Sequence, residues 1–203
     1  MSITTQPRVL PWPTPPFPVR RFTVDEYHRI LEAGVFAADE RSQLLEGWIV
    51  PKMTRNPPHE VTIVRVSRIL SGQIPAGWHG PAQLAITTAD SEPEPDFAVV
   101  RGEDCDYLHR HPAPHDLALV VEVVDSSLVS DRGAKARLYA RAEIPIYWLI
   151  NLVESRIEVY TDPTGPDVSP CFRQRRDFGI KESVPFVISG QDIGLISVAD
   201  LLP

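Results

Sequence analysis

Two carboxylates and a lysine in this chain are spaced so that they could hold a divalent cation and act on a phosphate. Glu122 interrupts the apolar run 117–124, where a carboxylate goes neutral unless a cation or strong donor holds its charge. Asp96 heads the apolar segment 97–100. If these two strands pair, the acids meet, and a divalent cation is the natural way to keep both ionised. Oxygen ligands of this kind suit magnesium or manganese, which can activate water toward a phosphodiester.

Lys135 lies in the segment that follows, on a helix expected over 131–142. Its ammonium would neutralise charge on the phosphate or orient the attacking water. A structural interpretation stays open beside this one. In that case Asp96 simply begins a strand, Glu122 faces solvent at a sheet edge, and Lys135 forms a helical i, i+4 surface pair with Asp131.

A second possible metal site is the histidine loop, in which His109, His111 and His115 fall within seven residues. Alternate positions of an extended segment share a face, so zinc is conceivable. Two features count against zinc here: prolines 112 and 114 stiffen a solvated loop, and no second ligand cluster completes four-coordination. Asp90, Glu92 and Glu94 also alternate before Asp96, but a solvated acidic turn accounts for them.

Composition favours a soluble protein of one domain. The chain has 203 residues, 43% of them hydrophobic and 23% charged, which are ordinary values for a globule with a real core. The net charge of −7 argues against nonspecific coating of nucleic acid, although local basic clusters could still form a groove. No apolar run is long enough to span a bilayer, so no membrane partner and a cytoplasmic location are expected. Cys105 and Cys171 lack zinc spacing and are expected to be reduced thiols.

The elements that would position these groups can be read from periodicity and capping. Residues 1–19 are proline-rich and predict an extended arm, and residues 20–203 predict a single domain. Helices are expected at 23–33, where Thr23 and Glu26 form a capping box, and from 56–58 to 72, on which His59 begins the buried stripe. Expected strands are a pair within 43–53 around a Glu46-Gly47 turn, and segments 81–88, 94–100, 117–124, 146–150, 156–160, 171–177 and 184–188, followed by a short segment at 198–202. This order favours an α+β or mixed α/β domain built on one central sheet.

A set of sequence blocks resembles the Uma-two family of restriction-type endonucleases over about residues 20–203. The blocks are Leu44-Leu-Glu-Gly47, Pro58-His59, Glu94-Pro-Asp-Phe-Ala-Val-Val100, Val120-Val-Glu-Val123, Asp131-Arg-Gly-Ala-Lys135, Tyr139-Ala-Arg-Ala142 and Ile144-Pro-Ile-Tyr-Trp-Leu-Ile150. The resemblance implies a PD-(D/E)XK restriction-endonuclease-like fold, with a central mixed sheet flanked by helices and a magnesium site at the strand ends.

The resemblance also assigns roles. Asp96 matches the motif aspartate, Glu122 the second acid, and the carbonyl of Val123 the main-chain metal ligand. The superfamily's lysine position is occupied by Val124, and Lys135 on the following helix matches the lysine that this family has moved. Glu46, His59, Asp131 and Tyr139 are accessory candidates, of which His59 could contact phosphate or relay a proton and Tyr139 could hydrogen-bond into the cleft. For His59 a helix-start histidine satisfied by backbone is the slightly favoured alternative, and Tyr139 could equally be a plain core aromatic.

Some positions depart from the family pattern. Gln43, Glu46 and Trp48 replace acids of the first strand pair, and Asp125-Ser126-Ser127 replaces Ser-Pro-Ser. The expected function is a magnesium- or manganese-dependent endonuclease that hydrolyses DNA phosphodiester bonds, acting as a homodimer if both strands are cut. The alternative is a nuclease-fold module that binds nucleic acid or a protein without turnover.

Overall fold

The computed structural model describes residues 18–37, 39–52, 56–125 and 131–203. Its centre is a six-stranded sheet in the order β3-β4-β5-β6-β7-β8. β5 and β6 are parallel and the other neighbours antiparallel, so the expected mixed sheet is confirmed. The strands are β3 (Trp78–His79), β4 (Phe97–Arg101), β5 (Leu117–Val124), β6 (Ile146–Asn151), β7 (Arg156–Pro163) and β8 (Phe172–Gly179).

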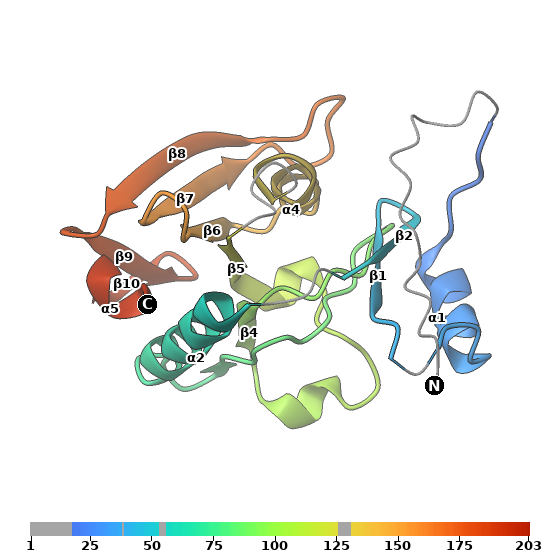
Figure 1. The fold of residues 1–203 in the computed structure, drawn as a ribbon, viewed down its shortest axis with the longest axis horizontal. Coiled ribbons are helices and arrows are strands. Elements are labelled where there is room, and N and C mark those ends of the chain that lie inside the picture. The colour runs from blue at the N-terminus through green and yellow to red at the C-terminus, as the bar shows by residue number, and fades with distance from the viewer. Residues whose placement is uncertain (1–17, 38, 53–55, 126–130) are drawn as a thin grey trace, which may run out of the picture.

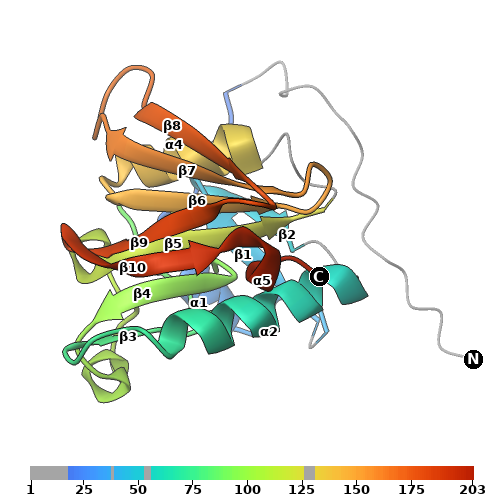
Figure 2. The ribbon, with the colours of Figure 1, turned by 90° about the vertical axis from the view of Figure 1, so that its left-hand side faces the viewer.

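Helices and two small two-stranded sheets surround the central sheet (Figures 1 and 2). On one face lie α2 (Pro57–Ser71), the hairpin of β9 (Ser183–Ile188) and β10 (Gln191–Ser197), and the short α5 (Val198–Leu201). The other face carries α4 (Ala136–Arg141). The hairpin of β1 (Ser42–Leu45) and β2 (Trp48–Pro51) contacts α4 through Glu46, and α1 (Val24–Glu32) lies beside this hairpin (Figure 1).

β5 is the central strand, and all eight of its residues are buried. Because side chains alternate across a strand, its residues enter two separate cores. Val121 and Val123 belong to the core beneath α2, whereas Val120 and Val124 belong to the core beneath α4. Glu122 therefore projects toward the α4 face, within a strand that has no solvated side.

Local signals predicted the helix starts and the first hairpin correctly. Thr23 and Glu26 form the capping box of α1, and the Asn56 side chain accepts the N–H of His59 at the start of α2. Glu46 and Gly47 form the turn of the β1–β2 hairpin with φ of 50° and 76°. A two-residue hairpin turn with positive φ at both positions matches the twist of its strands.

Three predictions from the sequence were wrong in detail. Residues 81–88 form no strand, since their backbone groups bond to scattered partners, including Pro93 and Pro112, instead of one ladder. β10 was missed, because Gln191, Asp192 and Gly194 interrupt its apolar pattern. The expected helix at 131 begins with a π-helical turn, η3 (Asp131–Lys135).

The loop before β5 contains two short 3₁₀ turns, η1 (Asp104–Tyr107) and η2 (Pro114–Asp116). Nearly all of the predicted proline arm, residues 1–17, lies outside the described residues, as do Ser126 and Ser127. In the part of the chain that is described, no helix combines the length and apolar character needed to cross a membrane.

Candidate active site

Asp96 and Glu122 lie opposite each other on neighbouring strands. The β4–β5 register pairs Phe97 with Val121, so one step further along this antiparallel pair Asp96 faces Glu122. Residues directly opposite have Cβ atoms about 5 Å apart. Both are buried, at 5% and 3% exposure. Asp96 is fixed further by the backbone N–H of Val123, which donates to Asp96 Oδ2 over 2.9 Å.

Lys135 reaches these acids from η3. Its Nζ lies 2.9 Å from Glu122 Oε2 and 3.1 Å from Asp131 Oδ1. The i, i+4 pair with Asp131 therefore exists, but it joins a buried carboxylate to a half-buried ammonium instead of lying on the surface. Glu122 lies on an inner strand of the sheet and does not face solvent at a sheet edge. A π-helical turn is rare and is frequently found at functional sites.

The charges of this group are strongly coupled. Burial raises the pKa of Glu122 to about 7, and although Lys135 opposes the rise, Asp96 and Asp131 add to it. Burial alone would lower the pKa of Lys135, but the neighbouring Glu122 and Asp131 carboxylates outweigh it and raise that pKa instead. Lys135 is therefore a permanent cation, while Glu122 is poised to change charge near neutral pH.

His59 approaches the other acid from the first turn of α2. Its Nε2 lies 3.3 Å from Asp96 Oδ2. Burial raises the pKa of Asp96, but the contacts with His59 and the Val123 N–H outweigh it and leave that pKa below its usual value. Asn56, which caps α2, also donates to the Asp125 carboxylate and so joins the helix start to the end of β5. The imidazole thus contacts the candidate metal ligand directly, instead of being a helix-start histidine satisfied by backbone alone.

Two tyrosines donate hydrogen bonds to Glu122 and Asp131. The hydroxyl of Tyr139, on α4, donates to Glu122 Oε1 over 2.6 Å, and Tyr147 on β6 donates to the carbonyl of Asp131 over 3.2 Å. Their rings are in contact, with centroids 5.1 Å apart. Both side chains are buried, and burial raises the pKa of each well above its ordinary value. Tyr139 is therefore both a core aromatic and a hydrogen-bond donor to the site.

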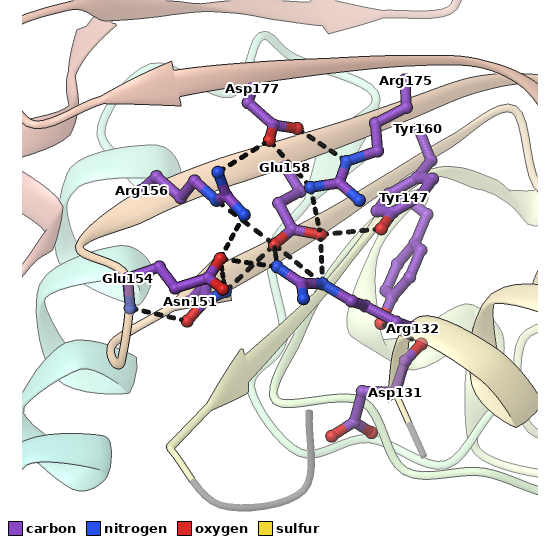
Figure 3. Close-up of polar contacts among 10 residues, drawn as sticks. All are labelled: Asp131, Arg132, Tyr147, Asn151, Glu154, Arg156, Glu158, Tyr160, Arg175 and Asp177. Atoms are coloured by element: carbon purple, nitrogen blue, oxygen red, sulfur yellow. Dashed lines mark hydrogen bonds and ion pairs between the residues drawn. The ribbon is translucent and has the colours of Figure 1, made fainter. Parts of the chain in front are cut away.

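A buried carboxylate on β7, Glu158, anchors the turn that carries Lys135 (Figure 3). Arg132, next to Asp131, places its Nε 3.0 and 2.9 Å from the two Glu158 oxygens. Asn151 and Tyr160 also donate to Glu158. Burial raises the pKa of Glu158, but these donors outweigh it and lower that pKa to about 2. The sequence reasoning missed this residue, although an acid between Ile157 and Val159 is the same signal that Glu122 gives.

Glu46 lies in the β1–β2 turn, where it pairs with arginines of α4 and not with Lys135. Its carboxylate accepts hydrogen bonds from Arg137 Nη2 over 2.6 Å and from Arg141 Nη1 over 3.0 Å. Burial raises the pKa of Glu46, but the hydrogen bond from Arg137 and the charge of Arg141 outweigh it and the pKa falls. The contacts join the β1–β2 turn to α4.

The three histidines of the 109–115 loop do not gather around one point. His115 is 78% exposed and lies 3.5 Å from Asp116, its chain neighbour, while His109 is exposed. Among the residues that the structure describes, the one group of three possible metal ligands consists of His28, Glu92 and His111. The loop therefore contributes one histidine to a cluster that the sequence reasoning did not foresee.

Comparison with known proteins identifies the family and the fold of the chain. The Uma2 (Uma-two) family model, described as putative restriction endonuclease, matches residues 24–184. The chain belongs to the Uma2 family. Among solved structures, a putative nuclease of DUF820 from Anabaena variabilis ATCC 29413 is similar, with a TM-score of 0.64 and 16% sequence identity over 89% of this chain and 97% of that chain. At that identity the likeness shows the shared fold. No curated protein matches the chain.

The Uma2 assignment fits the site at the level of a nuclease fold. The expected restriction-endonuclease-like architecture is confirmed. Asp96 and Glu122 offer only oxygen donors, which is the donor chemistry that magnesium and manganese prefer. Asp96 and Glu122 face each other on two paired strands, so one small cation could contact both. The residues present therefore fit the metal that such a fold implies.

Proposed function

We propose that this Uma2 protein is a metal-dependent endonuclease that hydrolyses DNA phosphodiester bonds. The observation that carries the proposal is the contact of Lys135 Nζ with Glu122 Oε2 at 2.9 Å, with Asp96 opposite Glu122 on the next strand. Two buried acids and a half-buried cation converge here from a strand start, a strand centre and a helical turn. Burial of charges is costly, and groups perturbed in this way cluster at functional sites.

Asp96 and Glu122 would hold magnesium or manganese together with the carbonyl of Val123. Val123 donates its N–H to Asp96, and in an antiparallel ladder the N–H and C=O of one residue point to the same neighbour, so this carbonyl faces β4 as well. When bound, the metal would lower the pKa of a bound water and polarise the phosphate. Lys135 would place its positive charge at the scissile phosphate and neutralise charge that develops there. His59, whose Nε2 lies 3.3 Å from Asp96 Oδ2, would contact the phosphate or relay a proton.

Cleavage of supercoiled plasmid in magnesium or manganese tests the proposal. Wild type should nick or linearise the plasmid, whereas Asp96→Asn, Glu122→Gln and Lys135→Met should each lose at least about a hundredfold in rate. Lys181→Ala, at an exposed lysine, is the matched control and should cleave as wild type does. Equal cleavage by all five proteins would indicate a contaminating nuclease and refute the assignment. Single-stranded DNA and RNA substrates in parallel establish which nucleic acid is cut.

A second candidate function is a module that binds nucleic acid or a protein without turnover. It is favoured by Gln43, which replaces an acid of the family pattern and whose buried side-chain oxygen has no hydrogen-bond partner among the described residues. Calorimetric titration with manganese separates the two functions. Manganese binding that Asp96→Asn abolishes, without cleavage of any substrate, would favour the module.

We also propose an oligomeric state and a cellular location for this enzyme. Cutting both strands of a duplex requires two sites, so we propose a homodimer, which sedimentation of the purified chain would detect. Action on cellular DNA would place the enzyme in the cytoplasm, and fractionation of cells that express it tests this location.

A further inference from the structure

Three segments far apart in the chain bring metal-binding side chains together outside the candidate active site. His28 lies on α1, Glu92 lies in the segment that bridges to β1 at Leu44, and His111 lies in the loop between η1 and η2. One ligand atom from each lies within 4.8 Å of the other two. We propose that His28, Glu92 and His111 bind a divalent transition metal of the zinc class.

The carboxylate of this cluster is buried and held in place. Glu92 is 5% exposed. Thr87 Oγ1 donates to Glu92 Oε2 over 2.8 Å, and the Glu92 N–H donates to the carbonyl of Leu44. A second hydrogen bond that orients a ligating carboxylate is typical of metal sites. His28 is 39% exposed at its side chain, so an ion can enter from the solvent side.

The spacing of the ligand atoms suits a small tetrahedral ion. His28 Nε2 lies 2.7 and 2.9 Å from the two Glu92 oxygens. Around zinc, with metal–ligand bonds near 2.0–2.1 Å, two ligand atoms of a tetrahedron stand roughly 3.3 Å apart. The imidazole and carboxylate need to separate by only about 0.5 Å to admit the ion. The rings of His28 and His111 lie edge to face with centroids 6.3 Å apart, and the ligand atom of His111 lies within 4.8 Å of the other two.

The donor set selects the class of metal. Two imidazole nitrogens and one carboxylate oxygen suit zinc, cobalt or nickel, whereas magnesium prefers oxygen ligands alone. Three protein ligands leave a fourth position for water. This site is therefore chemically distinct from the oxygen-only pair of Asp96 and Glu122, and its occupancy does not depend on whether the chain cuts DNA.

The site would fasten α1 to the rest of the domain. Tyr27 is the one buried residue of α1, and its hydroxyl donates to the carbonyl of Ser42 over 3.1 Å. A metal shared by His28, Glu92 and His111 would add a cross-link between α1, the bridge to β1 and the loop before β5. Because the metal binds the folded protein, it should raise the melting temperature.

Titration of metal-free protein with zinc in the presence of excess magnesium tests the inference. Wild type should bind one equivalent of zinc and melt at a higher temperature with it. His28→Ala and His111→Ala should each weaken zinc binding by at least about tenfold and lose the thermal shift. His109→Ala, at a neighbouring exposed histidine, and Asp96→Asn, in the candidate active site, are the matched controls and should bind zinc as wild type does.

Cobalt provides a readout that does not depend on stability. A cobalt-loaded site with tetrahedral nitrogen and oxygen ligands absorbs visible light, and this absorption should be present in wild type and absent in the His28 and His111 variants. Folding of each variant is checked by circular dichroism before titration. Absence of zinc binding by wild type, or binding that both histidine variants retain, would overturn the inference and leave His28 and Glu92 as a hydrogen-bonded pair.

Discussion

Replacing Glu122 by glutamine should make the protein more stable while abolishing the proposed cleavage. Glutamine keeps the shape of the side chain and can still accept the hydroxyl of Tyr139, but it removes the charge. Burial raises the pKa of Glu122 from an ordinary 4.5 to about 7, so the folded state resists ionisation of this group. The attraction to Lys135 is already included in that pKa. The free-energy cost of burying the Glu122 charge is therefore larger than the stabilisation that the charge gains from Lys135.

The magnitude follows from linkage between ionisation and folding. Below pH 4.5 Glu122 is protonated in both states, and its ionisation costs nothing. Between pH 4.5 and about 7 Glu122 ionises in the unfolded chain but not in the folded protein, so the cost grows with pH. Above about 7 Glu122 is ionised in both states, and the cost is constant. Each pKa unit corresponds to about 1.4 kcal/mol, so the cost reaches roughly 3 kcal/mol at pH 8 and is about 1 kcal/mol near pH 5.5. Glu122→Gln should be more stable than wild type by these amounts.

Urea denaturation at pH 8 and pH 5.5, without divalent metal, measures the difference. Glu60→Gln, at an exposed glutamate of α2, is the control and should change the free energy of unfolding by less than about 0.5 kcal/mol at either pH. A Glu122→Gln protein that is less stable than wild type at pH 8 would refute the reasoning, because the pair with Lys135 would then outweigh burial. Added manganese should stabilise wild type and leave the variant unchanged.

Three further outcomes follow from the structure. Glu158→Gln should lower the free energy of unfolding by about 3 kcal/mol at pH 7, since the pKa of Glu158 is lowered to about 2. The stability that this charge gives is present above pH 4.5 and is lost as pH falls toward 2. Melting curves of the variant and of wild type should therefore converge on acidification. Tyr139→Phe should raise the pKa of Glu122 further by removing its 2.6 Å hydrogen bond, so the pH profile of plasmid cleavage should move to higher pH, and an unchanged profile would count against this role. Gly47→Ala should destabilise the fold by about 1–2 kcal/mol in urea titrations, because the residue has φ of 76° and its new Cβ would lie 2.5 Å from Arg21 Cβ.

Much of the fold could be predicted because its signals are local. The apolar run of β5 gave the bounds 117–124, and the capping box of Thr23 and Glu26 marked the start of α1. The failures have a common physical cause. Residues 81–88 look apolar enough for a strand, yet their backbone groups bond to the following turn, to the start of β4 and to Pro112, and no local pattern specifies such a mixture of partners.

The sequence by itself determined which groups could perform chemistry. An acid among valines at Glu122, an acid at a strand start at Asp96 and a lysine in the next helical segment are properties of residue type and spacing. Tertiary structure alone decided which charges meet. The β4–β5 register placed Asp96 opposite Glu122, and the packing of α1 against the β1 region brought His28 to Glu92 and His111. Strand register and the packing of distant segments depend on contacts across the whole core, so spacing along the chain cannot specify them.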